Sequence, residues 1–186
     1  MHYEKKISAN MRERKRLGFN LHIKSLDNTG RFAGYASVFD MVDSQRDMML
    51  RGAFMATVKN RVQDIKLLWQ HQQDEPIGVF EAVFEDMHGL YVEGRLLLDV
   101  ARAKEAYTLL KSGAISGMSI GYSPVRYRID AETGVRKLAE VDLWEISLVT
   151  FPANAAANVT VVKQANDLDL LVAALSKAEN SLRQFL

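Results

Sequence analysis

A serine between two glycines is the first feature of the sequence that could support chemistry. The segment Gly117-Met118-Ser119-Ile120-Gly121 matches the pattern Gly-x-Ser-x-Gly, in which the small flanking residues leave a nucleophilic hydroxyl accessible to a substrate. A match of five residues has low specificity, because the same pattern also arises in turns and bulges. Ser116 is a rival nucleophile, but it lacks the flanking glycine pair. Ser119 is therefore the stronger candidate.

The order of residues along the chain limits which serine hydrolases the pattern could belong to. All four histidines precede the serine: His2, His22, His71 and His88. In α/β-hydrolases the histidine follows the serine, so this order excludes that fold, and the alternation of strands and helices typical of it is also missing. A chymotrypsin-like order of base, acid and serine fits the sequence, but 186 residues are few for the two β-barrels of that fold.

His71 is the best-placed candidate for a general base. It directly follows the apolar run Leu67-Leu68-Trp69 and precedes the polar segment 72–76, so it stands at the end of a buried strand. Such a position holds a side chain firmly and leaves it accessible. The alternative is a hydrogen-bonded histidine without a catalytic role. The other three histidines fall in the basic N-terminal segment, on a strand surface and in a turn.

A base of this kind needs an acidic partner that fixes its tautomer, and Glu145 is the candidate. It lies within the apolar run 143–149, where a carboxylate is costly to bury unless it is paired. Glu145 is thus either a functional acid or half of a structural ion pair, unless Glu145 and Ser147 both face solvent. The possible ion-pair partners and the more exposed alternative acids are Arg126, Arg128, Glu140 and Asp142.

Composition narrows the class of protein. Apolar residues make up 48% of the chain, and the net charge of 24 − 23 = +1 does not favour a nucleic-acid partner. Without cysteine there are no disulfides, no thiolate nucleophile and no Cys-ligated metal. No apolar run reaches the roughly 20 residues of a membrane span, and no metal-ligand spacing or glycine-rich phosphate loop is present. We expect a cytosolic protein without a cofactor.

Hydrophobic periodicity predicts short strands with a few helices. Turn chemistry predicts a hairpin over Phe19–Val38 around Asp27–Gly30, followed by a polar loop over 39–51. Asp99 is expected to cap a helix that Gly113 ends. The other predicted elements are helices over 53–61 and 100–112 and strands over 66–70, 77–84, 90–98, 116–122, 124–129, 136–139, 143–150 and 159–163.

The predicted fold class is α+β, a bent antiparallel β-barrel surrounded by helices. Residues 1–18 form a basic leader, and residues 19–163 form the domain. Residues 164–186 form a C-terminal amphipathic helix, whose apolar stripe could cover the barrel or pair with a second subunit or scaffold. The leader is expected to be solvated or to contact an acidic partner or nucleic acid.

Four blocks of sequence, in order along the chain, resemble the prohead (procapsid maturation) proteases of tailed bacteriophages, which are related in fold to the herpesvirus assemblin proteases. The resemblance covers residues 19–163 and is far more specific than the serine motif alone. The blocks are Gly34–Phe39 with Arg51–Phe54, Leu67–His71 with Pro76–Gly78, Leu110–Gly113 with Ser116–Tyr122, and Glu145–Asn154.

The resemblance implies a serine endopeptidase with Ser119 as nucleophile, His71 as general base and Glu145 as the third member of the triad. The herpesvirus relatives have a second histidine in the third position, so an acid there is a departure from them. The implied substrates are the scaffolding segment of the major capsid protein and the chain itself, cleaved inside the procapsid in the host cytoplasm. A homo-oligomer is possible, and no membrane is involved. The turn Phe151–Asn154 is an oxyanion candidate by position only.

Two other functions compete with this interpretation. A non-enzymatic capsid or scaffold interaction protein could keep the fold, although the presence of both Ser119 and His71 argues against it. A cytosolic serine esterase or peptidase unrelated to capsids would hydrolyse small acyl esters without any assembly partner.

Overall fold

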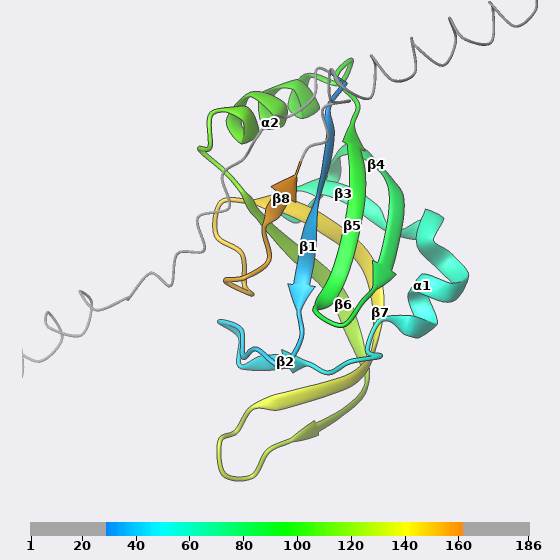
Figure 1. Ribbon diagram of the computed structural model, residues 1–186, viewed down its shortest axis with the longest axis vertical. Helices are drawn as coiled ribbons and strands as arrows, with labels where there is room; N and C mark the ends of the chain where they lie inside the picture. The colour runs from blue at the N-terminus through cyan, green and yellow to red at the C-terminus, as the bar shows by residue number, and fades with distance from the viewer. Residues whose placement is uncertain (1–28, 162–186) are drawn as a thin grey trace, which may run out of the picture.

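The fold is known from a computed structural model, which describes residues 29–161 (Figure 1). The predictions for the basic leader, for the first strand of the Phe19–Val38 hairpin and for the C-terminal helix lie outside the described residues.

Eight strands form one sheet, accompanied by two α-helices and one turn of 3-10 helix within the described residues. The strands are β1 (Arg31–Val38), β2 (Asp47–Met49), β3 (Lys66–Trp69), β4 (Gln72–Glu85), β5 (Gly89–Leu96), β6 (Gly117–Ile129), β7 (Arg136–Val149) and β8 (Val159–Val161). The helices are α1 (Met55–Arg61), η1 (Val62–Asp64) and α2 (Ala101–Lys111).

Strand β7 organises the sheet. It pairs with β6 in antiparallel fashion on one side, and with β3 and β2 in parallel on the other. Beyond β3 the sheet continues through β4, β5, β1 and β8. The sheet curls so far that its two ends meet: the Met118 N–H donates to the Ala157 carbonyl, and the Val159 N–H donates to the Ser116 carbonyl. The result is a strongly curved, barrel-like sheet (Figure 1).

The helical part of the prediction needs correction. In the described residues the sheet is accompanied by α1 and α2 and is not surrounded by helices, and its pairing is mixed rather than wholly antiparallel. Helix α2 buries Ala103, Ala106 and Leu110 against the sheet, as its apolar stripe predicts. Asp99 does not cap this helix: Val100 occupies the N-cap position, and its N–H donates to the Leu97 carbonyl in a preceding turn.

The central strands β3 and β7 are buried on both faces, since consecutive residues of each are buried. Leu67 and Leu68 on β3 and Ile146 and Leu148 on β7 are all buried, in agreement with the apolar runs that predicted these strands. Two pairs of predicted strands are continuous in the structure, as β6 and as β7. Pro124 does not end β6, because the ladder shifts register between Pro124 and Arg126. The predicted loop 39–51 contains the short strand β2.

No helix within residues 29–161 is long and apolar enough to cross a membrane.

Candidate active site

The antiparallel register between β6 and β7 positions the candidate nucleophile. Ser119 stands directly opposite Ser147, and Gly121 stands opposite Glu145. Directly opposed side chains share a face and have Cβ atoms about 5 Å apart. Ser147 and Glu145 are two residues apart on one strand, so they also share that face. Ser119, Ser147 and Glu145 therefore project from the same side of the β6–β7 pair.

His71 reaches this face from a tight turn between β3 and β4. Trp69 pairs with Gln72, which leaves Gln70 and His71 as the two turn residues, with φ of 50° and 62°. Positive φ at both central positions is the geometry of a two-residue type I′ hairpin turn. The Gln70 N–H donates to the Leu148 carbonyl at 3.0 Å, and the His71 N–H donates to Ser147 Oγ at 3.0 Å. These bonds fasten the turn to β7.

A short hydrogen bond joins the candidate base and acid. His71 Nδ1 lies 2.6 Å from Glu145 Oε1, and Ser147 Oγ donates to Glu145 Oε2 at 2.7 Å. Glu145 is only 5% exposed, whereas the His71 side chain is 45% exposed. Because an ionised carboxylate can only accept, Nδ1 carries the proton in this arrangement. Nε2 of neutral His71 is then the nitrogen that can accept a proton.

The same hydrogen bond sets the electrostatics of the base. The bond from Glu145 raises the pKa of His71 above its ordinary value of 6.5, its charge adds to the effect, and partial burial opposes it. The buried carboxylate thus stabilises the imidazolium form of His71.

The structure shows which partner Glu145 has. Glu145 and Ser147 do not face solvent, since both are buried. Arg126 pairs with Glu140 at 3.5 Å rather than with Glu145, and Asp142 pairs with Arg61. The Glu145 carboxylate instead pairs with His71, which was selected as the candidate base because it follows a buried strand and stays accessible.

The serine itself is less exposed than its glycine-flanked motif predicts. Ser119 is 6% exposed, and its hydroxyl makes no hydrogen bond with residues 29–161. The flanking glycines make room for neighbouring side chains. A Cβ on Gly121 would lie 2.3 Å from Glu145 Oε1, and one on Gly117 would lie 2.6 Å from Pro152 Cδ. Gly121 therefore lets the acid lie close against the strand that carries the serine.

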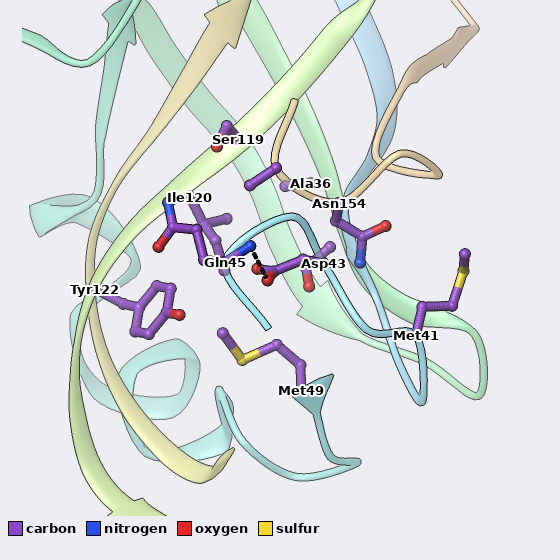
Figure 2. A pocket seen from close by; sticks show the side chains of 11 residues that line it. Ala36, Met41, Asp43, Gln45, Met49, Ser119, Ile120, Tyr122 and Asn154 are labelled. Atoms are coloured by element: carbon purple, nitrogen blue, oxygen red, sulfur yellow. Dashed lines mark hydrogen bonds between the residues drawn. The ribbon is translucent and has the colours of Figure 1, made fainter. Parts of the chain in front are cut away.

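A narrow pocket opens beside Ser119 (Figure 2). The chain from 41 to 49 forms much of its wall, with Met41 and Met49 contributing apolar surface and Asp43 a carboxylate. Oδ1 of Asp43 accepts the backbone N–H groups of Gln45 and Asp47, both at 2.8 Å, and burial raises the pKa of Asp43. The pocket has a volume of about 20 Å³, room for about one water molecule next to the candidate nucleophile.

The oxyanion candidate Phe151–Asn154 lies partly beside this pocket. Ala153 and Asn154 line it, but Phe151 is exposed. The side-chain amide of Asn154 is bonded to the Val38 carbonyl and the Ala156 N–H. The Asn154 side chain therefore has other partners.

Three contributors to the site were not predicted as such: Ser147, Gly121 and Gln70. Ser147 bridges the base and the acid, Gly121 accommodates the acid, and Gln70 shares the positive-φ turn with His71. Their roles depend on the register of β6 and β3 against β7. The one available signal was the spacing of Glu145 and Ser147, two residues apart in an apolar strand.

Among residues 29–161, no group of three or more His, Asp or Glu side chains is arranged to hold a metal ion.

Comparison with known families supplies the context for this geometry. The family model described as Caudovirus prohead serine protease matches residues 19–169. The chain belongs to this family. The matched region of this prohead serine protease includes Ser119, His71 and Glu145 and the elements that carry them.

The curated relatives agree with this family assignment. The chain is 34% identical over 145 residues to the prohead protease of Enterobacteria phage HK97, and the aligned region covers 76% of this chain and 64% of that protein. It is 39% identical over 108 residues to a capsid polyprotein of Pseudomonas phage PAJU2, covering 53% of this chain and 16% of that protein. The prohead protease of Escherichia phage T5 is 23% identical over 155 residues, covering 80% and 72%. The chain thus spans less than two thirds of the first two relatives.

Two solved structures resemble this member of the family at low sequence identity. The bacteriophage T4 capsid assembly protease aligns with a TM-score of 0.49 and 13% identity, over 64% of this chain and 82% of that one. The KSHV protease in complex with a hexapeptide phosphonate inhibitor aligns with a TM-score of 0.45 and 12% identity, over 69% and 62%.

Proposed function

We propose that this chain is a serine endopeptidase of phage capsid maturation, in which Ser119 is the nucleophile, His71 the general base and Glu145 the acid that orients the base. Membership of the prohead serine protease family supports the reaction class. The observation that carries the residue assignment is the 2.6 Å contact between His71 Nδ1 and buried Glu145, on the sheet face from which Ser119 projects.

The proposed reaction is acyl transfer through a covalent intermediate. Ser119 Oγ attacks the carbonyl carbon of the scissile peptide bond while His71 Nε2 takes the hydroxyl proton. The tetrahedral intermediate collapses, the C–N bond breaks, and the imidazolium gives its proton to the leaving amine. Water, deprotonated by His71, then attacks the acyl-enzyme, which releases the carboxylic acid product and restores the Ser119 hydroxyl. Glu145 stays ionised and stabilises the imidazolium in both halves of the reaction.

The proposed substrates are the scaffolding segment of a capsid protein and the protease chain itself, cleaved within the procapsid. Two relatives are named as prohead proteases, and a third is named as a capsid polyprotein. These names support a partner of the capsid-protein class.

Labelling with a fluorophosphonate probe tests the triad without knowledge of the cleavage site. The probe phosphonylates an activated serine, and peptide mass mapping locates the adduct. We expect an adduct at Ser119 that is absent in Ser119→Ala and strongly reduced in His71→Ala. Ser116→Ala is the matched control, since Ser116 lies just before β6 and should leave labelling unchanged.

Co-expression with the phage's own capsid protein tests the substrate. Cleavage that depends on Ser119 would support the maturation protease. Labelling at Ser119 and hydrolysis of small esters without any capsid cleavage would favour an unrelated serine esterase. A folded protein with no adduct, alone or with capsid protein, would contradict the triad and favour a non-enzymatic interaction protein.

A further inference from the structure

Three side chains in the candidate site form a closed ring of hydrogen bonds. Ser147 Oγ accepts the backbone N–H of His71 at 3.0 Å and donates to Glu145 Oε2 at 2.7 Å. The other carboxylate oxygen, Oε1, lies 2.6 Å from His71 Nδ1. The ring therefore begins at the main chain of His71 and returns to the imidazole of the same residue.

The donors and acceptors in this ring fix the position of each proton. A backbone N–H can only donate, so the Ser147 oxygen accepts from His71 and its single hydroxyl proton is free for Glu145. An ionised carboxylate can only accept, so both of its oxygens are matched by donors, the Ser147 hydroxyl and the His71 Nδ1–H. The Nε2 lone pair of neutral His71 then remains for the nucleophile. Ser147 is fully buried, so water does not replace it in the ring.

We propose that Ser147 is a positioning residue that fixes the Glu145 carboxylate against His71 and holds His71 in the tautomer able to accept the Ser119 proton. This inference rests on the proposed function and extends it from three residues to four. Ser147 acts through its two neighbours, and it fastens the backbone of the turn and the carboxylate with one hydroxyl.

Loss of the Ser147 hydroxyl has a defined electrostatic consequence. In Ser147→Ala the buried Oε2 atom loses its donor, so His71 is the one partner in the ring that the carboxylate keeps. The carboxylate charge, no longer shared with the Ser147 hydroxyl, then stabilises the His71 imidazolium more strongly. Because the reactive form is neutral His71, which keeps its Nδ1 proton and has lost its Nε2 proton, the acid limb of reactivity should move to higher pH. Glu145→Gln removes the carboxylate and should move the limb in the opposite direction.

Few other charged groups face this pair in the described part of the chain. The pKa of His71 responds to the hydrogen bond and charge of Glu145 on β7 and to burial. Lys66 of β3 stands level with Glu145 in the parallel register, but it is exposed and forms no ion pair with Glu145. Strand β6 presents the uncharged Ser119 and Gly121. A shift of the acid limb in Ser147→Ala can therefore be assigned to the ring.

The test is the rate of fluorophosphonate labelling at Ser119 as a function of pH. At about pH 7 we expect Ser147→Ala to label about 10- to 100-fold more slowly than the wild type, the range for losing a hydrogen bond to a charged group, with its acid midpoint at higher pH. Ser147→Cys keeps the volume but offers only a weak donor, so it should shift the midpoint in the same direction. It also serves as the second variant if Ser147→Ala fails to fold.

Thr57→Val is the matched control. Thr57 is also a buried hydroxyl against β7, donating to the Val141 carbonyl at 3.3 Å and accepting the Leu143 N–H at 3.2 Å, but it belongs to α1 and does not contact the ring. We expect Thr57→Val to lower stability and to leave the pH midpoint of the folded protein unchanged.

A spectroscopic measurement separates failure of this inference from failure of the proposed function. In ¹⁵N-labelled wild type, NMR should show a low-field Nδ1–H proton of His71 that shifts or broadens in Ser147→Ala. Normal Ser119 labelling with an unmoved midpoint and an unmoved Nδ1–H signal in Ser147→Ala would overturn the positioning role alone. Absence of Ser119 labelling in the wild type would overturn the proposed function and, with it, a catalytic role for the ring.

Discussion

At the scale of single residues, the site depends on one buried negative charge. Glu145 lies in an apolar strand, where an unpaired carboxylate would be expensive, and both of its oxygens are occupied by partners from the site. The partners of Glu145 therefore matter to the candidate site as much as Ser119, His71 and Glu145 do. The pH at which His71 titrates should reveal its pairing with Glu145.

The pH dependence of labelling should report this partner. His71 must be neutral to act as a base, and Glu145 raises its pKa, so the labelling rate of the wild type should rise through a midpoint above about 6.5. In Glu145→Gln we expect a lower midpoint, because the bond and charge that raise the pKa are gone. The plateau rate should fall by about 10³- to 10⁴-fold because Gln no longer enforces the correct tautomer. A midpoint that stays in place would contradict the pairing.

Gly121 offers a second test at this scale. In Gly121→Ala the new Cβ would lie 2.3 Å from Glu145 Oε1 and 2.7 Å from its Cγ, so the carboxylate must move. A displacement of about 1 Å in a catalytic group can cost 100-fold in rate, and we expect a loss of that order in labelling of Ser119.

The control for this prediction is Gly94→Ala, where the new Cβ would lie 2.6 Å from the ring of Phe32, in the core and away from the site. It should lower the free energy of unfolding by about 1–3 kcal/mol, as overpacking does, without changing labelling per folded molecule. Equal labelling of the folded Gly94→Ala and Gly121→Ala variants would show that Gly121 has no special relation to the acid.

At the scale of elements, the β3–β4 turn is the part that brings the base to the other residues. Gln70 and His71 both have positive φ, a conformation in which residues other than Gly, Asn and Asp are disfavoured. The strain is held by contacts with β7 and with Thr150, the residue that follows β7 and binds the Gln70 side chain. Its Nε2 donates to Thr150 Oγ1 at 2.8 Å, and its Oε1 accepts the Thr150 N–H at 3.3 Å.

A double-mutant cycle measures how far this clamp secures the turn. Gln70→Ala and Thr150→Val should each lower the free energy of unfolding by about 0.5–1 kcal/mol, since the bonds are exposed to solvent. The double variant should lose less than the sum, because both changes remove the same bond. Urea denaturation gives the three values. Strictly additive losses would mean that the two side chains do not interact in solution.

The same elements show what sequence reasoning can and cannot reach. The apolar run before His71 and the apolar strand around Glu145 identified two unusual polar residues, and the structure brings them together at 2.6 Å. The glycine-flanked Ser119 was found by its motif. Each of these signals lies within a short stretch of sequence, so it can be recognised without knowledge of the fold.

What was missed depends on register and on tertiary context. Whether Ser147 faces Glu145 or solvent depends on which strands cover β7, and no local pattern contains that information. The break predicted at Ser123, between the strands 116–122 and 124–129, fails because β6 continues through Pro124 with a shift of register. The cap predicted at Asp99 fails because a turn over Leu97–Val100 delays the helix by one residue. A barrel surrounded by helices was predicted from short helices interspersed among the strands. The described residues contain two short α-helices, α1 and α2.

At the scale of the whole molecule, a buried ion pair helps to join three strands, β2, β6 and β7, and it includes none of the three residues of the candidate triad. Asp47 of β2 is 2% exposed and binds Arg136 of β7 through Nε at 2.7 Å, and the Tyr122 hydroxyl of β6 donates to its Oδ2 at 2.5 Å. Burial alone would raise the pKa of Asp47, but the hydrogen bonds from Arg136 and Tyr122 outweigh it and lower the pKa. Burial, together with the hydrogen bond to Asp47 and its charge, raises the pKa of Tyr122.

Asp47→Asn should therefore destabilise the fold without direct contact with the triad. We expect the free energy of unfolding at about pH 7 to fall by about 2 kcal/mol, moderated because Arg136 is partly exposed. Because the folded pKa of Asp47 lies below its unfolded value, the contribution is present above about pH 4 and is lost as the pH falls through the folded pKa. The stability gap between wild type and Asp47→Asn should narrow in that acidic range.

Asp130→Asn is the comparison, since Asp130 lies at the turn between β6 and β7 and binds Lys137. It should change stability much less at about pH 7. A pH-independent gap for Asp47→Asn would contradict the role assigned to this pair.

The central position of β7 also has a consequence in time. Ser119 acquires its neighbours by closing an antiparallel hairpin with β7, but His71 reaches Glu145 only through the parallel pairing of β3 with β7, across 74 residues of chain. Pairings of such long sequence separation are slow to form, because the entropy of closing the loop must be paid first. In the proposed assignment, a newly made or refolding chain carries an inert serine until β3 docks on β7. In refolding experiments, Ser119 should become reactive toward the probe no earlier than Trp69, at the end of β3, reaches its native fluorescence.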